Sequence, residues 1–342
     1  MLKTRIEKRT LNFIQPAGTS RGVYTTHDIW LVYLSSDRYP GRIGVGECAP
    51  LPDLSCDAMP CYEERLRELC AVLEQTESLD ASLLRPYPSM LFGLETALLS
   101  LKKGDIIFDT PFSRGEEGIP INGLVWMGSF EEMTERLERK IKDGFTCVKL
   151  KIGAIDFDSE LALVKSIRQR FSRDVVEIRV DANGGFSVAD APGRLEALSK
   201  YGIHSIEQPI RQKQWREMSS LCRNTPLPIA LDEELIGINI PGMKEEMLDV
   251  VKPQYVVVKP SLHGGMAGTR EWIEMADRRG IGSWITSALE GSVGLSAISQ
   301  LASDIYGPGI TMPQGLGTGA LYSNNLPALT EVRGCKIWMK RK

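Results

Sequence analysis

The segment Thr146-Cys-Val-Lys-Leu-Lys-Ile-Gly153 is an apolar run that carries two lysines, Lys149 and Lys151, at alternate positions. Side chains two positions apart on a strand share a face, so both ammonium groups project from one side of it. Later apolar runs end in an acid or a lysine, namely Asp181, Glu207, Asp232 and Lys259. The carboxyl ends of the strands in a parallel barrel converge on one mouth. We therefore expect these acids and lysines to share one pocket.

Strand-like and helix-like segments alternate strictly from Ile119 to Ala302. Parallel neighbouring strands need crossover connections, and these favour helices. Seven strand–helix pairs with one further strand position therefore predict an α/β fold, a modified TIM barrel of the (β/α)7β type. An open doubly wound sheet is the weaker alternative, because the Gly-rich stretch Gly315–Gly319 lies near the end and does not open a helix.

The region before the alternating pattern has strand-like runs followed by helical patterns, which predicts a separate α+β unit. We expect residues 1–115 to form a capping domain and residues 116–324 to form the catalytic barrel. The tail from Val332 to Lys340 alternates weakly, so residues 325–342 are expected to return as a strand onto the N-terminal unit.

Composition narrows the classes of function. The 342 residues carry a net charge of −3 with acids and bases interspersed, which argues against a nucleic-acid partner or an anionic membrane. The start of the sequence lacks the hydrophobic segment of a signal peptide, and no apolar run reaches transmembrane length, so a cytoplasmic location is expected. Seven cysteines without zinc-like spacing and only three histidines argue against a disulfide scaffold or a zinc enzyme. These features favour a small-molecule partner, and a homo-oligomer remains compatible with them.

Carboxylates gathered at one mouth repel one another unless a cation or protons compensate them. Oxygen ligands favour Mg²⁺, with Mn²⁺ as the alternative. A lysine has a reference pKa of about 10.4 and is a poor base unless a neighbouring ammonium, a dication and burial lower its pKa. A metal beside a substrate carboxylate also favours loss of the adjacent α-proton. Each acid alone also fits a helix cap or an ion pair, and each lysine alone fits an edge-strand residue, but the joint pattern favours a catalytic set.

The motifs resemble those of the enolase superfamily, and within it the muconate-lactonising subgroup, over essentially the whole chain. They are Lys149-Leu-Lys151, Asp181-Ala-Asn183, Ile206-Glu-Gln-Pro209, Leu231-Asp-Glu233 and Val258-Lys-Pro260. The resemblance implies that Asp181, Glu207 and Asp232 bind Mg²⁺, that Lys151 is the general base and that Lys259 lies across the substrate from it. It also implies that Lys149, Asn183 and Glu233 support these metal ligands and catalytic lysines.

Within the subgroup, Thr286–Leu295 and Gln314–Gly319 resemble the seventh- and eighth-strand motifs of the o-succinylbenzoate synthases. The dipeptide epimerases carry an Asp-x-Asp on the last strand, whereas Thr311–Asn325 contains no acid. The implied reaction is loss of water from 2-succinyl-6-hydroxy-2,4-cyclohexadiene-1-carboxylate, a small carboxylate, in menaquinone biosynthesis. Pro16–Val23 and Gly46–Pro52 resemble the two cap loops that face the substrate. The substrate-binding residues that the resemblance suggests are Ser20, Arg21, Ser287, Glu290, Gly317 and Thr318.

Other functions fit parts of the pattern. An N-acylamino acid racemase, a cycloisomerase or a dipeptide epimerase would share the lysines and carboxylates of the subgroup. A Schiff-base aldolase would use a strand-terminal lysine but leave the three carboxylates unexplained. A non-catalytic barrel would leave the whole lysine and carboxylate set unexplained.

Overall fold

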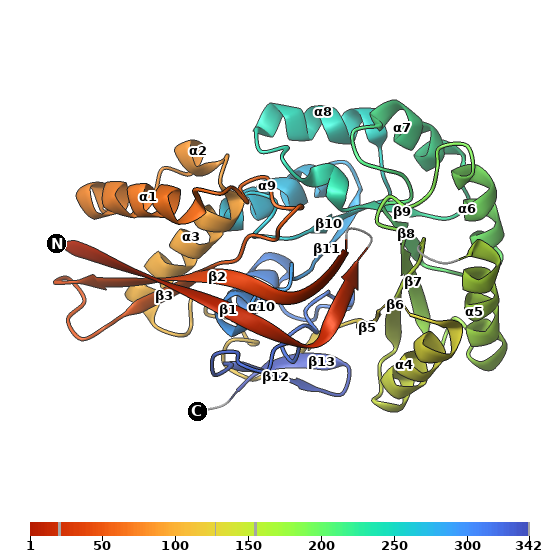
Figure 1. Ribbon diagram of the computed structural model, residues 1–342, viewed down its shortest axis with the longest axis horizontal. Coiled ribbons are helices and arrows are strands. Elements are labelled where there is room, and N and C mark those ends of the chain that lie inside the picture. The colour runs from red at the N-terminus through yellow and green to blue at the C-terminus, as the bar shows by residue number, and fades with distance from the viewer. Residues whose placement is uncertain (20–21, 127, 154–155, 341–342) are drawn as a thin grey trace.

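Seven parallel strands, which lie side by side in the order of the sequence, form the centre of the molecule (Figure 1). The computed structural model describes residues 1–342 except 20–21, 127, 154–155 and 341–342. The strands are β5 (Gly123–Val125), β6 (Cys147–Lys151), β7 (Glu177–Asp181), β8 (Ser205–Glu207), β9 (Ile229–Leu231), β10 (Tyr255–Val258) and β11 (Gly282–Ile285). Each pairs in parallel with its sequence neighbour, as the alternating strand–helix pattern predicts.

Gln314 and Gly315 take the eighth strand position and close the barrel. Gln314 makes a parallel bridge to Ile121, just before β5, and Gly315 makes one to Thr286, just after β11. The Gly315 N–H donates to the carbonyl of Ile285 at 2.9 Å. A Cβ on Gly315 would lie 1.9 Å from Thr286 Oγ1, so only glycine permits this close approach. The structure confirms the predicted (β/α)7β barrel.

One helix follows each barrel strand and covers the outside of the barrel. The helices are α4 (Phe130–Lys142), α5 (Phe157–Arg170), α6 (Ala191–Ser199), α7 (Trp215–Asn224), α8 (Pro241–Val251), α9 (Gly265–Asp277) and α10 (Ser292–Tyr306), with a short 3-10 helix η1 (Glu233–Leu235) before α8. Val148 and Leu150 of β6 are fully buried in the core with Leu163 and Ile167 of α5. The alternate residues of β6, Lys149 and Lys151, consequently face the barrel interior.

The N-terminal region forms an antiparallel sheet packed against helices, which agrees with the expected α+β unit. Its strands are β1 (Leu2–Thr19), β2 (Gly22–Ser36) and β3 (Gly44–Cys48), and its helices are α1 (Tyr62–Thr76), α2 (Ala81–Leu84) and α3 (Pro88–Lys103). β3 packs directly on α3, since both contacting residues are glycines. A Cβ on Gly46 would lie 1.8 Å from the carbonyl oxygen of Gly93. The long β1–β2 hairpin reaches from this cap across to the barrel (Figure 1).

The C-terminal tail forms strands β12 (Thr330–Arg333) and β13 (Lys336–Met339), and β13 pairs with β4 (Ile119–Pro120) rather than with the β1–β3 sheet. The chain just before the tail does reach the N-terminal hairpin, since the Ile14 N–H donates to the Leu321 carbonyl at 2.8 Å. Apolar alternation predicts a strand but does not select its partner. The domain boundaries at 115/116 and 324/325 stay a prediction.

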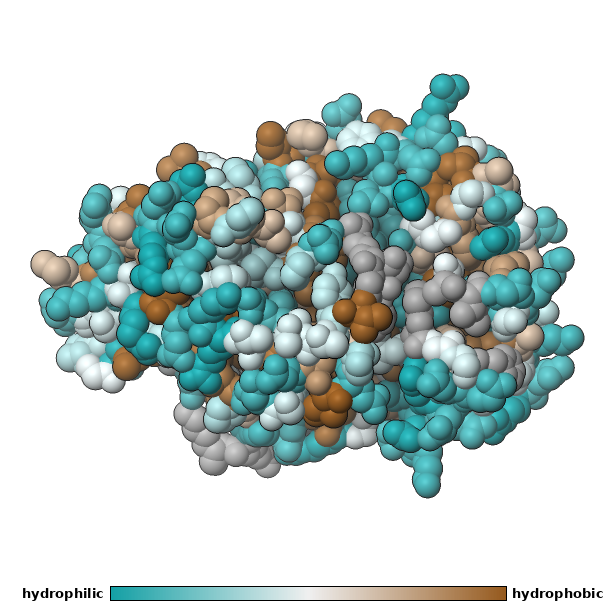
Figure 2. Space-filling view, viewed as in Figure 1, coloured by the Kyte–Doolittle hydropathy of each residue, from teal (hydrophilic) through white to brown (hydrophobic). Residues whose placement is uncertain are grey.

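Polar and charged side chains cover most of the face seen in Figure 2, and the hydrophobic residues on it are scattered rather than gathered into one large patch. In the described part of the chain, no helix combines the length and the apolar character needed to cross a membrane.

Candidate active site

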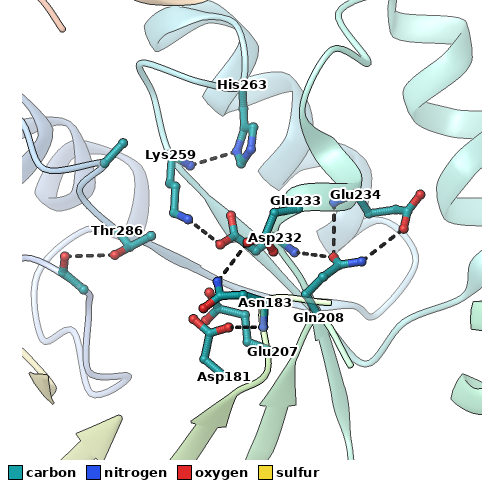
Figure 3. A network of polar contacts seen from close by, with 12 residues as sticks. Asp181, Asn183, Glu207, Gln208, Asp232, Glu233, Glu234, Lys259, His263 and Thr286 are labelled. Carbon is teal, nitrogen blue, oxygen red and sulfur yellow. Dashed lines mark hydrogen bonds and ion pairs between the residues drawn. The ribbon is translucent and has the colours of Figure 1, made fainter. Parts of the chain in front are cut away.

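Three buried carboxylates lie at the carboxyl ends of three adjacent strands (Figure 3). Asp181 and Glu207 are the last residues of β7 and β8 and pair directly across the sheet, while Asp232 follows the last residue of β9. Glu207 pairs with Ala230, and Asp232 stands two residues beyond it, so all three side chains emerge on the same face of the sheet at its carboxyl edge. The structure thus brings together the three acids that the sequence singles out.

Three lysines contact these carboxylates from both sides of the row. Lys149 Nζ lies 2.8 Å from Asp181 Oδ2 and 2.6 Å from Glu207 Oε2, and Lys151 Nζ lies 2.5 Å from Asp181 Oδ2. On the far side, Lys259 forms an ion pair with Asp232 Oδ2. Lys151, on β6, and Lys259, after β10, therefore flank β7, β8 and β9 from opposite directions.

The ionic contacts decide the protonation of the cluster. Burial disfavours the ammonium of Lys149, but Asp181 and Glu207 outweigh it and hold its pKa well above its ordinary value. Burial likewise opposes the charge on Lys259, yet Asp232 and Glu207 raise its pKa. For these two lysines, contact with a carboxylate is therefore a stronger effect on the pKa than burial.

The two acids of the pair on β7 and β8 shift in opposite directions. Burial disfavours the carboxylate form of Asp181, but Lys149 and Lys151 outweigh it and hold its pKa well below the ordinary value. Burial and the neighbouring Asp181 together raise the pKa of Glu207, although Lys149 opposes them. Asp181 contacts both lysines of β6 whereas Glu207 contacts Lys149, which accounts for the opposite directions of the two shifts.

Asn183 and Glu233 surround Lys151 and its carboxylate partner. The side-chain amide of Asn183 donates to Glu233 Oε1 at 2.8 Å, and its carbonyl oxygen accepts from Lys151 Nζ at 2.8 Å. The backbone of Asn183 has a φ of +43°, a left-handed conformation that asparagine tolerates better than most residues. This turn directs the amide back toward the strand ends, so Asn183 links Lys151 to Glu233.

A cavity with an empty volume of about 850 Å³ opens above these strand ends. Its polar floor contains the three lysines with Asn183 and Glu233. Ser287, Gly317 and Thr318 contribute to its walls, and their role as substrate-binding residues stays a prediction. The Thr318 hydroxyl donates to Ser287 Oγ at 2.9 Å, which joins the loops after the seventh and eighth strand positions.

Residues 132–312 match the family model described as enolase C-terminal domain-like. An o-succinylbenzoate synthase from Desulfotalea psychrophila is 48% identical, with 95% of each chain covered. The chain belongs to the o-succinylbenzoate synthase family of the enolase superfamily. The crystal structure of MenC from Desulfotalea psychrophila superposes with a TM-score of 0.85 at 43% identity, and the match covers 99% of both chains. A dipeptide epimerase from Cytophaga hutchinsonii, solved with Mg and D-Ala-L-Val, shares the fold at 18% identity, with a TM-score of 0.84 and coverage of 98% of this chain and 92% of its own.

Relatives in the enolase superfamily bind Mg²⁺, as the Cytophaga structure shows. In the described part of this chain, no three His, Cys, Asp or Glu side chains are arranged as a group that could hold a metal ion. The three acids instead contact lysine ammonium groups. The donor set nevertheless fits a hard divalent cation. All three acids offer oxygen, and Asp232 Oδ1 is buried with no hydrogen-bond partner.

The remaining predicted substrate-binding residues are Glu290, Ser20 and Arg21. Glu290 does not line the cavity. It is buried beneath the wall, where it accepts hydrogen bonds from Ser287 Oγ at 2.6 Å and from the Ala288 N–H at 2.7 Å. The prediction that Glu290 contacts substrate is corrected to a buried anchor of the loop, since its carboxylate turns toward the nearest backbone and hydroxyl donors. Ser20 and Arg21 lie outside the described residues.

Several residues that line the cavity are not among the site residues predicted from the sequence. Tyr24, Leu51 and Leu54 reach the cavity from the cap, and Trp126 reaches it from the end of β5. The position of Trp126 directly after a barrel strand was a usable signal, because such positions face the mouth. The cap residues lie in or beside the two loops that resemble the substrate-facing loops of the family, but nothing in the pattern singled them out.

Proposed function

We propose that this protein catalyses the Mg²⁺-dependent dehydration of 2-succinyl-6-hydroxy-2,4-cyclohexadiene-1-carboxylate to 2-succinylbenzoate, in menaquinone biosynthesis. The observation that carries the proposal is the placement of Lys151 and Lys259 on opposite sides of a row of buried carboxylates beneath one cavity. The extent of the similarity to the Desulfotalea psychrophila synthase supports this choice within the superfamily.

In this mechanism, Lys151 in its neutral form accepts the ring proton next to the substrate carboxylate. The hydroxyl group leaves with its bonding electrons and the ring becomes aromatic, so the proton on Lys151 and the departing hydroxide account for the water lost. Lys259 stays protonated and stabilises the negative charge that develops on the opposite face, with a cation–π contribution from the ring. Lys149 balances the charge of Asp181 and Glu207.

Asp181, Glu207 and Asp232 are the residues that would hold the metal ion. Bound Mg²⁺ supplies positive charge beside the substrate carboxylate and so favours loss of the neighbouring proton. The proposal also places the enzyme in the cytoplasm, with a small carboxylate as its substrate.

A direct comparison of substrates tests the proposal. The purified protein with Mg²⁺ is assayed on the cyclohexadiene carboxylate, on N-succinyl amino acids and on dipeptides. We expect dehydration to have the highest kcat/KM. Efficient racemisation of N-succinyl amino acids without dehydration would instead assign the protein to the racemase alternative. A borohydride-trapped substrate adduct with full activity in EDTA would point to an aldolase.

A further inference from the structure

The cavity wall formed by Ser287, Ala288 and Leu289 is held in an unusual backbone conformation. Leu289 has a φ of +66°, a left-handed value that costs a residue with a Cβ about 1 kcal/mol or more and persists only where the surroundings impose it. Its carbonyl oxygen accepts a hydrogen bond from the Tyr322 hydroxyl at 2.6 Å and lies 3.1 Å from His27 Nδ1. His27 belongs to cap strand β2, so the cap contributes to holding this barrel loop.

A second contact from the cap lies directly after this wall. Glu47 of β3 is fully buried, and its Oε1 accepts from the Gly291 N–H at 2.5 Å while its Oε2 accepts from the Gly294 N–H at 2.8 Å. These donors belong to the first turn of α10, whose N-cap residue is Gly291 and therefore has no side chain to cap the helix. A carboxylate is well suited to this position, because it satisfies unpaired N–H groups and complements the helix dipole.

The two glycines leave room for the Glu47 carboxylate close to the backbone. A Cβ on Gly291 would lie 3.0 Å from Glu47 Oε2, and a Cβ on Gly294 would lie 3.3 Å from the Glu47 carboxyl carbon. The barrel therefore presents a bare helix start that fits the Glu47 carboxylate, and the cap supplies that carboxylate. Figure 1 shows α10 beside the cap strands, in agreement with this arrangement.

Glu47 also lies just before the cap segment that faces the cavity. Four residues after it, Leu51 lines the cavity, and Leu51 packs in one apolar cluster with Ala288 and Leu289. One carboxylate thus fixes the spacing between a cap wall and a barrel wall of the same cavity.

We propose that Glu47 is a positioning residue for the substrate, which acts by holding the Ser287–Leu289 wall against the Leu51 wall. This inference deepens the proposed function and rests on it for the identity of the substrate. Glu47 contacts no reacting atom, so its loss should weaken substrate binding far more than it slows the chemical step.

The alternative is that Glu47 only attaches the cap to the barrel, and the chain offers a matched control for that role. Glu95 of α3 accepts from the Met266 and Ala267 N–H groups at 2.5 and 3.1 Å, at the start of α9. It is a second cap carboxylate at the start of a barrel helix, and neither Glu95 nor its two donors line the cavity. A purely structural role predicts the same behaviour for Glu47→Gln and Glu95→Gln.

The experiment compares steady-state kinetics of the two variants on the cyclohexadiene carboxylate with Mg²⁺ and follows amide hydrogen exchange in the absence of substrate. For Glu47→Gln we expect KM to rise about tenfold, with kcat within about threefold of the parent. Hydrogen exchange should become faster across residues 287–294. For Glu95→Gln we expect a lower melting temperature, KM within about twofold of the parent and unchanged exchange in that segment.

Equal changes in KM and in exchange for the two variants would overturn the positioning role, as would a fall in kcat without a change in KM for Glu47→Gln. If Glu47→Gln does not fold, Tyr322→Phe removes the hydroxyl that donates to the Leu289 carbonyl. A smaller rise in KM is then expected, because His27 still lies beside that carbonyl. An unchanged KM in Tyr322→Phe would then count against the proposal. A parent protein without dehydratase activity would refute the proposed function, whereas the exchange comparison would still test whether Glu47 holds the wall.

Discussion

At the scale of single residues, the site depends on which charges touch. Lys151 contacts both Asp181 and Asn183, whereas Lys149 contacts the Asp181 and Glu207 carboxylates. These two lysines stand two residues apart on the same face of β6. Of the two, Lys151 donates to the Asn183 side chain, which in turn donates to Glu233. This difference supports Lys151 as the base and Lys149 as the residue that balances the acids.

Replacement of the base gives the most direct prediction. Lys151→Ala should lower kcat by a factor of about 10² to 10⁴ or more, because a general base usually contributes that much to the rate. The variant should still bind Mg²⁺, since all three acids remain. Stopped-flow or steady-state dehydration assays measure the loss, and a rate equal to that of the parent would remove Lys151 from the mechanism.

Metal binding gives a prediction that needs no substrate. Excess Mg²⁺ should raise the melting temperature, because a ligand that binds only the folded state stabilises it by mass action, by about 2.7 kcal/mol at a concentration 100 times Kd. Asp232→Asn should remove most of this rise, because it replaces the acid whose Oδ1 has no hydrogen-bond partner. Differential scanning fluorimetry with Mg²⁺ and with EDTA measures the shift. An equal shift in the parent and in Asp232→Asn would exclude Asp232 as a ligand.

At the scale of elements, the barrel strands were predictable and the loop conformations were not. Apolar runs that end at Lys151, Asp181 and Glu207 identify β6, β7 and β8, and parallel strands must bring those ends together. The direction of Glu290 depends on hydrogen bonds within its own loop, which no periodic pattern encodes. Tyr24 comes from the N-terminal cap, far from the barrel strands in the sequence, so only the assembled fold places it at the cavity.

Helix α3 provides a prediction about pH. Buried Asp57 accepts hydrogen bonds from the Ser89 N–H and hydroxyl at 2.8 and 2.7 Å, but its Oδ1 has no partner. Burial raises the pKa of Asp57 to about 6, although the bonds from Ser89 oppose the shift. Between pH 4 and 6 the unfolded chain has released this proton while the folded chain keeps it, so stability falls as pH rises through this window.

The shift corresponds to about 3 kcal/mol of unfolding free energy. Asp57→Asn cannot titrate, so the stability of the parent relative to this variant should fall by up to that amount between pH 4 and 6 and stay constant above about pH 7. Urea unfolding at a series of pH values measures the difference, with Asp277→Asn at an exposed position as the control. A difference that does not vary with pH would show that Asp57 titrates alike in both states.

At the scale of the whole molecule, the cavity exists only where cap and barrel meet. Tyr24 and Leu51 come from the cap, and Ser287 and Thr318 come from the barrel. The chemistry resides on the barrel strands, while the shape of the space above them depends on how firmly the cap is attached. Strong contacts between the two parts are therefore a requirement of the site as well as of stability.

One such contact is an ionic cluster between the parts. Arg85, after cap helix α2, makes two hydrogen bonds of 2.8 and 2.6 Å to Glu271 of α9. Lys244 of α8 is fully buried and reaches Glu271 at 2.8 Å. Burial of Glu271 opposes its ionisation, but Arg85 and Lys244 outweigh it and lower its pKa to about 2. Glu271 thus joins the cap to two barrel helices.

The two ends of this cluster should respond unequally to substitution. Glu271→Gln leaves the buried Lys244 ammonium without a carboxylate and should cost about 3 kcal/mol, the lower end of the range for an unpaired buried charge. Arg85→Met leaves the Lys244–Glu271 pair intact and removes only a partly exposed partner, so its cost should be about 1 kcal/mol. Urea unfolding of both variants measures this. The contact between Arg85 and Glu271 is the only one lost in both variants. Equal losses of unfolding free energy would therefore show that this contact, and not the pairing of the buried lysine, dominates.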